Sequence, residues 1–138
     1  MNEILEIKNV TKYYGKGSVV TKALDGISFS VEKGEFTAIM GASGSGKSTL
    51  LNVISTIDRV SSGEIFIEGA RLTEMEEKQL ANFRRDQLGF IFQEYNLLDT
   101  LTIGENILLP LNLQRKSHED ADRELVRVSE ALGVSDQL

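Results

Sequence analysis

A glycine-rich stretch, MGASGSGKSTLL, occupies residues 40–51 and contains the residue types that bind phosphate. Gly41, Gly46, Lys47 and Ser48 match the pattern G-x-x-x-x-G-K-[ST]. Glycines allow phosphate oxygens to approach main-chain N–H groups closely, and their positive φ angles can turn those N–H groups inward. Because apolar segments flank the stretch on both sides, the pattern predicts a phosphate-binding loop rather than a flexible linker.

The residues that close this loop would have separate tasks. Lys47 would place a positive charge against the β- and γ-phosphates of a nucleotide, and the Ser48 hydroxyl can ligate Mg²⁺. The first turn of a following helix would add free N–H groups and the positive end of its dipole. The candidate nucleotide-binding residues of the loop are Gly41, Ala42, Ser43, Gly44, Ser45, Gly46, Lys47, Ser48 and, at the α-phosphate, Thr49.

The neighbouring sequence predicts a strand before the loop and a helix after it. EFTAIM, residues 35–40, is nearly all apolar, as is typical of a strand buried on both faces. LGFIFQ, residues 88–93, predicts a second such strand, and Gln93 would stand at its carboxyl end, where ligands bind in open α/β sheets. A solvated loop glutamine is the alternative interpretation. Apolar residues repeat at helical spacing after the loop, at Leu50, Leu51, Ile54 and Ile57.

Alternating apolar and polar residues predict half-buried strands at 4–10 and 24–31, and a shorter strand within SSGEIFIEG at 61–69. The first of these segments leads into an aromatic pair, Tyr13 and Tyr14, either of which could stack on a base. The alternative is that both are ordinary strand residues.

The second half of the chain is predicted to be mainly helical. Charged residues 74–85 form one helix, and TIGENILLPL forms another, with Pro110 as its kink or its end. A last helix begins near Ser117, which Asp120 would help to cap, and stops at Gly133. Its predicted apolar face consists of Ala121, Leu125, Val128 and Leu132.

Composition excludes several classes of protein. The 138 residues carry a net charge of −6, which argues against a nucleic-acid partner, and no cysteine, which excludes disulfides. The N-terminus does not resemble a signal peptide, and no apolar run is long enough to span a bilayer. The expected location is therefore the cytoplasm.

Two long stretches resemble the N-terminal part of the ATPase subunit of ATP-binding-cassette (ABC) transporters. YYGKGSVVTKALDGISFSVEKGEFTAIMGASGSGKSTLLNVIS is similar to the opening of that family, and RRDQLGFIFQEYNLLDTLTIGENILLPL to its glutamine-loop region. The resemblance is strongest to the macrolide-export and lipoprotein-release branch, and within it to bacitracin-type antimicrobial-peptide resistance transporters. It implies ATP and Mg²⁺ as ligands, and export or resistance as the process that ATP hydrolysis drives.

This resemblance also implies a fold. The expected fold class is α/β, with a P-loop NTPase (RecA-like) core, an N-terminal antiparallel β subdomain and the start of a helical subdomain. Residues 1–138 would be the N-terminal portion of a nucleotide-binding domain. Roughly 1–33 and 61–70 would form the antiparallel β region and 34–60 the P-loop core. Residues 71–138 would contain the remaining core strand, the glutamine loop and the first part of the helical subdomain.

Roles and partners follow from the same resemblance. Tyr14 would be the adenine-stacking aromatic, Lys47 and Gln93 would act in catalysis, and Ser48 and Gln93 would contact Mg²⁺. The parent protein would form a homodimer of nucleotide-binding subunits. It would also dock on a membrane permease, which would hold it peripherally at the inner face of the cell membrane. The apolar residues that would meet the permease, with core packing as the alternative, are Leu97, Leu98 and Leu101.

Several motifs of the family do not occur in these residues. There is no LSGGQ signature and no apolar run ending in Asp-Glu after Gln93, and the one histidine, His118, opens a polar helix as a solvated residue. The family would continue for about 80 to 120 more residues, close to one further small domain. We therefore expect residues 1–138 alone to hold nucleotide weakly without useful ATP hydrolysis, because phosphoryl transfer needs several groups at once.

Other interpretations remain open from the sequence. One is a nucleotide-binding fragment without catalysis, and another is a soluble cassette ATPase that has no permease. A nucleotide kinase or GTPase would predict a base-recognition motif such as [NT]-K-x-D, which does not occur in the sequence. An incomplete parallel sheet would leave apolar surface uncovered and favour self-association.

Overall fold

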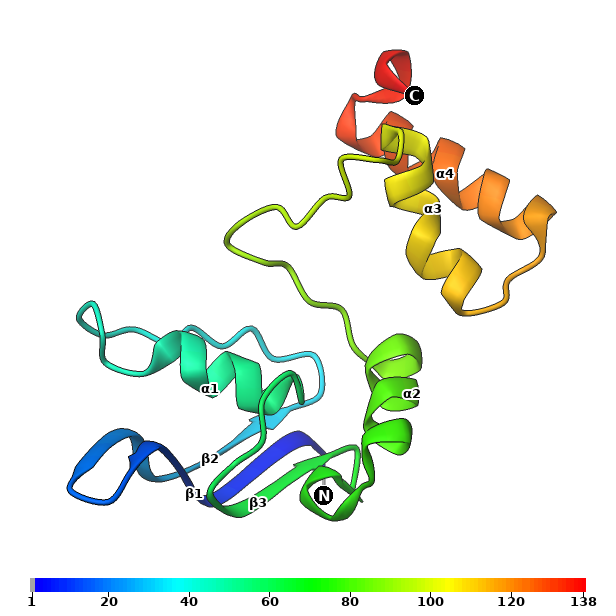
Figure 1. Ribbon diagram of the computed structural model, residues 1–138. Coiled ribbons are helices and arrows are strands. Elements are labelled where there is room, and N and C mark those ends of the chain that lie inside the picture. Colours follow the sequence, from blue (N-terminus) through cyan, green and yellow to red (C-terminus); the bar gives the residue numbers. More distant parts are fainter. Residues whose placement is uncertain (1) are drawn as a thin grey trace. The chain divides into compact units, whose positions relative to one another are not determined.

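The computed structural model describes residues 2–138, which form two compact units (Figure 1). The first ends at Arg84, and the second covers Arg85–Leu138. The boundary lies within α2 (Glu77–Gln87), so this helix contributes residues to both units.

An antiparallel sheet with the strand order β2-β1-β3-β4 forms the base of the first unit (Figure 1). Its centre is a long hairpin, in which β1 pairs with β2, and β3 pairs with the other edge of β1. The antiparallel strands predicted from alternation are therefore confirmed, and the first two run further, up to the hairpin turn. The strands are β1 (Glu3–Lys16), β2 (Val19–Glu32), β3 (Ser62–Ile67) and β4 (Ala70–Arg71).

The helix that follows the glycine-rich loop, α1 (Lys47–Ile54), lies over one face of this sheet (Figure 1). It buries Leu50 and Val53, which are three residues apart and therefore share a helix face. The predicted helical face is partly wrong, because Leu51 and Ile57 are exposed. Their positions differ from the prediction because the buried face runs through Val53 and the helix ends before Ile57.

The sheet supplies the rest of this core. Ile7 of β1 lies directly opposite Ile65 of β3, and both are almost fully buried. Val10 is fully buried, and Leu72 and Leu80 extend the core towards α2. The sheet face that carries these side chains is the face that α1 covers. The packing of α1 on the sheet therefore also sets the position of the glycine-rich loop that precedes this helix.

The second unit is built around α3 (Ile103–Leu113) and α4 (His118–Leu132). Thr102 begins α3 with a capping box: its hydroxyl accepts from the Glu105 N–H at 3.2 Å, and the Glu105 carboxylate accepts from the Thr102 N–H at 2.7 Å. Pro110 lies inside α3 and does not end it. The predicted helix is thus confirmed, and the proline is an internal residue.

Both predicted ends of α4 are confirmed. The Ser117 hydroxyl accepts from the Asp120 N–H at 3.2 Å, and Gly133 follows the helix with a φ of 67°. Ala121 of the predicted apolar face is buried, whereas Leu132 is exposed.

Two short 3-10 helices complete the described chain, η1 (Leu72–Glu74) before α2 and η2 (Ser135–Gln137) after α4. None of the helices formed by residues 2–138 combines the length and the apolar character that crossing a bilayer requires.

The two segments predicted as buried strands are not strands. Residues 35–40 and 88–92 have no regular secondary structure, and Phe36 and Ile91 are 97% and 98% exposed. A parallel strand is stable only when neighbouring strands accept and donate its hydrogen bonds. Within residues 2–138 no strand pairs with either segment. Apolar composition predicts a tendency to be buried, but it does not supply the partner that burial requires.

Replacing Val10 by alanine is expected to lower the free energy of unfolding by about 2 kcal/mol, because two buried methyl groups are lost and a cavity remains. Val19→Ala removes the same atoms at the exposed end of the hairpin, where the residue is 75% exposed. It is expected to change the stability by no more than about 0.5 kcal/mol. Urea unfolding followed by circular dichroism measures both changes. Equal losses would contradict the placement of the core.

Candidate functional site

The glycine-rich loop ends in the first turn of α1. Gly46 is the N-cap residue of this helix and adopts a φ of 95°. Because it has no side chain, no side-chain hydrogen bond caps α1 in the described chain. The first N–H groups of a helix have no intrahelical partners and lie at the positive end of the helix dipole. The local structure therefore leaves N–H groups for an anion at this point.

Close packing against the sheet fixes the end of the loop. A Cβ atom at Gly46 would overlap the backbone carbonyl oxygen of Ala23 in β2 and would lie 3.2 Å from Leu24 Cδ2. Gly44 also has a positive φ, of 78°, but a Cβ there would meet open space. Gly46 therefore serves two needs, a left-handed backbone and contact with β2, whereas Gly44 serves only the first.

Lys47 directs its ammonium group back into the loop. Its Nζ donates to the carbonyl oxygens of Gly41 at 2.9 Å and Ala42 at 2.7 Å, and it lies 3.4 Å from Ser45 Oγ. The loop also closes on itself through the Ser45 N–H, which donates to the Ala42 carbonyl at 3.2 Å. All these acceptors are neutral, so an anionic phosphate oxygen would be the stronger acceptor for the ammonium group.

The remaining predicted residues of the loop lie around this centre. Ser43 and Ser48 are exposed, so their hydroxyls are accessible to a ligand. Thr49 is half-buried on α1, and its side chain is near enough to Tyr14 to act on the pKa of the tyrosine hydroxyl, which it lowers. The structure thus brings Tyr14, predicted from resemblance alone, next to the helix that the loop begins.

Tyr14 is held by two charged side chains. Its hydroxyl donates to Asp58 Oδ2 at 2.8 Å, and the Lys12 ammonium lies 4.9 Å from the centre of its ring. Lys12 Nζ also donates to Asp58 Oδ1 at 2.6 Å, so the three side chains form one cluster. Burial, and then the hydrogen bond to Asp58, raise the pKa of Tyr14, which keeps its hydroxyl a donor.

The neighbouring Tyr13 belongs to a separate cluster. Its hydroxyl donates to Asp25 Oδ1 of β2, and Lys22 Nζ lies 5.3 Å from its ring centre. Successive side chains of a strand point to opposite faces, which accounts for the separation. The Tyr14 hydroxyl donates to Asp58 in the turn after α1, whereas Tyr13 reaches that part of the chain through its backbone N–H, which donates to Ser61 Oγ.

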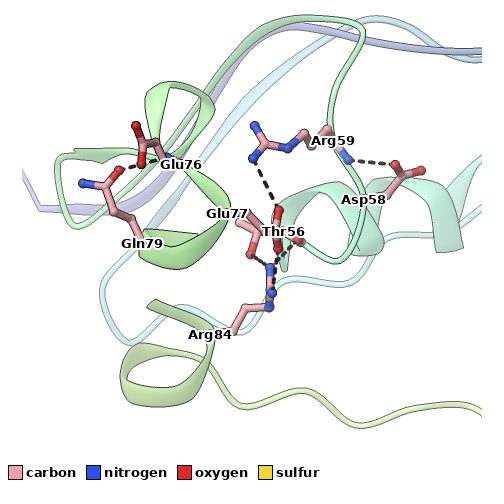
Figure 2. Close-up of polar contacts among 7 residues, drawn as sticks. All are labelled: Thr56, Asp58, Arg59, Glu76, Glu77, Gln79 and Arg84. Atoms are coloured by element: carbon pink, nitrogen blue, oxygen red, sulfur yellow. Dashed lines mark hydrogen bonds and ion pairs between the residues drawn. The ribbon is translucent and has the colours of Figure 1, made fainter. Parts of the chain in front are cut away.

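The segment that carries Asp58 is anchored by α2, as Figure 2 shows. Arg84 donates to the Thr56 carbonyl at 2.8 Å and to Glu77 at 3.0 Å. Glu77 in turn accepts from Arg59 at 3.3 Å, and the Arg59 N–H donates to Asp58 at 2.7 Å. Hydrogen bonds from Arg84 and then Arg59 hold the pKa of Glu77 below its ordinary value. These contacts fix the turn after α1 in position.

Sequence reasoning did not identify Asp58, Lys12 or Arg84. Lys12 carried a weak local signal, because it lies two residues before Tyr14 and hence on the same face of the strand. Asp58 is 44 residues from Tyr14, and no periodic pattern links the two positions. Only the pairing of β1 with β3 and the path of α1 bring them together.

Gln93 lies in the second unit, in the exposed segment between α2 and α3. Its action on a nucleotide therefore stays a prediction. The same unit has a groove of about 260 Å³, whose lining begins at Leu97, shortly after Gln93 in the sequence. Leu97 is 64% exposed. The apolar lining of the groove consists of Leu97, Leu98, Leu101, Ile103 and Ile107.

Comparisons with known proteins agree on one family. The family model described as ABC transporter matches residues 24–138. The bacitracin export ATP-binding protein BceA of Halalkalibacterium halodurans is 56% identical over 131 residues, 95% of this chain and 52% of that protein. The ABC transporter ATP-binding protein YxdL of Bacillus subtilis is 54% identical over 138 residues, 100% of this chain and 53% of that protein. The macrolide export ATP-binding/permease protein MacB of Hyphomonas neptunium is 48% identical over 107 residues, 78% of this chain and 17% of that protein.

A solved structure gives the same result. The dimeric ATP-binding cassette MJ0796, bound to ADP and Pi after hydrolysis, matches with a TM-score of 0.83 and 38% identity, over 89% of this chain and 54% of that chain. This match confirms the predicted α/β P-loop fold class. The chain spans about half the length of the first curated relatives it matches.

Substituting Gly46 by alanine is expected to lower the free energy of unfolding by at least about 2 kcal/mol, since strain at positive φ adds to the overlap with Ala23. Gly44→Ala has the backbone strain alone and is expected to cost about 1 kcal/mol. Urea denaturation of the two variants measures the difference. If Gly44→Ala were the more destabilising change, the seating of the loop on β2 would be wrong.

The Asp58 carboxylate should stabilise the fold in a pH-dependent manner. Burial raises its pKa, but hydrogen bonds from Lys12, Tyr14 and the Arg59 N–H outweigh burial and hold the pKa below its ordinary value. A lowered pKa means that the stabilisation is complete above the unfolded pKa and is lost as the pH falls through the folded pKa. Asp58→Asn is therefore expected to destabilise the protein at neutral pH, with a difference that shrinks only below about pH 4. Unfolding measurements from neutral to acidic pH give the stability difference between the unsubstituted protein and Asp58→Asn. A difference that stayed the same at all pH values would contradict this prediction.

Proposed function

Because this chain belongs to the ABC transporter family, we propose that it is ATP-binding sequence of a transporter that couples ATP binding and hydrolysis to export. The proposed cargo is an antimicrobial peptide or another lipophilic compound, in line with the similarity to the bacitracin export protein BceA and the macrolide export protein MacB. The observation that carries the proposal is the loop at residues 41–46. It ends at the uncapped start of α1, and Lys47 aims its ammonium group into the loop.

The loop fits the terminal phosphates of ATP. The N–H groups at the start of α1 and the Lys47 ammonium would bind the β- and γ-phosphates, and Thr49 would lie near the α-phosphate. The absence of a Cβ at Gly44 and Gly46 leaves room for this approach. Bound Mg²⁺ would neutralise phosphate charge, with the exposed Ser48 hydroxyl as the oxygen ligand that this chain offers it.

Tyr14 is the proposed contact for the base. Its hydroxyl donates to Asp58 in the turn that follows α1, and the residue keeps 43% of its surface exposed. A base that stacked on its ring would thus belong to the same molecule whose phosphates the loop holds. Aromatic stacking of a base contributes about 1–3 kcal/mol in nucleic-acid complexes, and a contribution of this order is expected here.

Gln93 and the groove in the second unit are proposed to serve coupling. Gln93 would contact the metal and the γ-phosphate, and its segment continues directly into the groove at Leu97. We propose that this groove meets a membrane permease and that a second nucleotide-binding subunit completes the ATP site. Two relatives support these partners: MacB is an ATP-binding/permease protein, and MJ0796 is a dimeric cassette. The protein would then lie at the inner face of the cell membrane.

Lys47→Ala is expected to weaken MgATP binding at least tenfold, about 1.4 kcal/mol, because it removes the ammonium group that is aimed into the loop. Lys78→Ala, at an exposed position of α2, removes an equal charge away from the loop and serves as the matched control. Isothermal titration calorimetry of the purified protein gives both affinities. MgATP binding that is insensitive to Lys47→Ala, or equally sensitive to both changes, would refute the proposed site.

A further inference from the structure

We propose that Asp58 is a positioning residue for base recognition, because it fixes the ring of Tyr14 from the turn that follows α1. This inference rests on the proposed function, in which Tyr14 stacks on the nucleotide base. Asp58 itself does not lie on the phosphate-binding loop, and it contacts the ring only through the hydroxyl group. Asp58 would therefore affect the position of the Tyr14 ring and not the binding of the phosphates.

The carboxylate acts on Tyr14 in two ways. Oδ2 accepts the tyrosine hydroxyl at 2.8 Å, which fixes the far end of the ring. Oδ1 accepts from Lys12 at 2.6 Å, and Lys12 in turn places its ammonium 4.9 Å from the ring centre. One ring face is thus directed towards a cation, while 43% of the residue surface remains exposed for a base. A ring held at its hydroxyl and at one face loses little conformational freedom when a base stacks on it.

Lys12 is committed to this cluster. Its side chain is only 12% exposed, and its ammonium also donates to the Arg59 carbonyl at 2.6 Å. It therefore already has acceptors on two sides and is poorly placed to bind a phosphate. The charge of Lys12 serves the ring and Asp58, in contrast to that of Lys47.

Asp58 is held in turn by the rest of the first unit. The Arg59 N–H donates to its carboxylate, and Arg59 pairs with Glu77 of α2 (Figure 2). Arg84 ties α2 to the Thr56 carbonyl just before Asp58. The position of the tyrosine ring is therefore set by contacts that reach from α2 through the turn to β1.

The Tyr13 cluster provides a matched control in the same protein. Its hydroxyl donates to Asp25, and Lys22 lies over its ring and 3.3 Å from the Asp25 carboxylate. The chemistry is the same, but the side-chain contacts that join Tyr13, Asp25 and Lys22 lie within the hairpin. Asp25→Ala thus removes a tyrosine–carboxylate hydrogen bond without touching Tyr14.

The test compares two ligands, ATP and inorganic tripolyphosphate, by calorimetric titration of the purified protein in the presence of Mg²⁺. Tripolyphosphate has the phosphates but no base. Asp58→Ala is expected to lower the ratio of ATP affinity to tripolyphosphate affinity about three- to tenfold, part of the range of a base–aromatic stack. Asp25→Ala is expected to leave the ratio unchanged. A purely structural effect of Asp58→Ala would weaken both ligands together, which would overturn the proposal.

A double-mutant cycle tests whether Asp58 acts through the ring. Tyr14→Ala should lower the same ratio, and Tyr14→Ala/Asp58→Ala should lower it no further. Asp58→Asn, which keeps an oxygen acceptor for the tyrosine hydroxyl, should retain more of the ratio and replaces Asp58→Ala if that variant does not fold. A ratio lowered by Tyr14→Ala but not by either change at Asp58 would overturn this inference alone. Absence of ATP binding by the unsubstituted protein would overturn the proposed function, and this inference with it.

Discussion

The close approach of Gly46 to the Ala23 carbonyl determines the position of the glycine-rich loop. Any side chain at position 46 would overlap β2, so the loop can reach the sheet only at a glycine. α1 starts at this contact and is then fixed on the sheet by Leu50 and Val53. The free N–H groups at the start of the helix therefore occupy a position set by packing, before any ligand is present. A preorganised anion site of this kind does not spend binding energy on ordering the loop.

How far the sequence predicts this fold depends on where the partners of each segment lie. β1 and β2 are adjacent in the sequence, and their alternation predicts both their existence and the face they bury, as the structure confirms. Residues 35–40 and 88–92 have equally strong apolar composition but no paired strand within residues 2–138. A parallel strand depends on partners distant in sequence, and composition carries no information about them. The helix cap at Ser117 was recognisable because capping is local.

The candidate site divides in the same manner. Its phosphate side is a continuous motif, so every residue from Gly41 to Thr49 could be proposed from spacing and residue type. Its base side is assembled from three parts of the chain, and the pattern alone could not decide between Tyr13 and Tyr14. The choice of Tyr14 came from family resemblance and stays a prediction; in the structure the Tyr14 hydroxyl donates to Asp58, and the Tyr13 hydroxyl to Asp25. Asp58 could not be predicted, because it is 44 residues from Tyr14 in the sequence and the two side chains meet only in the folded chain.

The register of the β1–β2 hairpin decides which of the two tyrosines, Tyr13 or Tyr14, faces Asp58. The pairing shifts between Lys12 and Tyr13, and each tyrosine then faces its own aspartate. A slip of one residue in a strand sends every side chain to the opposite face. A hairpin assembled out of step would still carry an intact glycine-rich loop, but Tyr13 would take the face of Tyr14, and Asp58 would lose the Tyr14 hydroxyl as its donor. Two neighbouring rings of identical chemistry thus acquire different partners through the alignment of backbone hydrogen bonds.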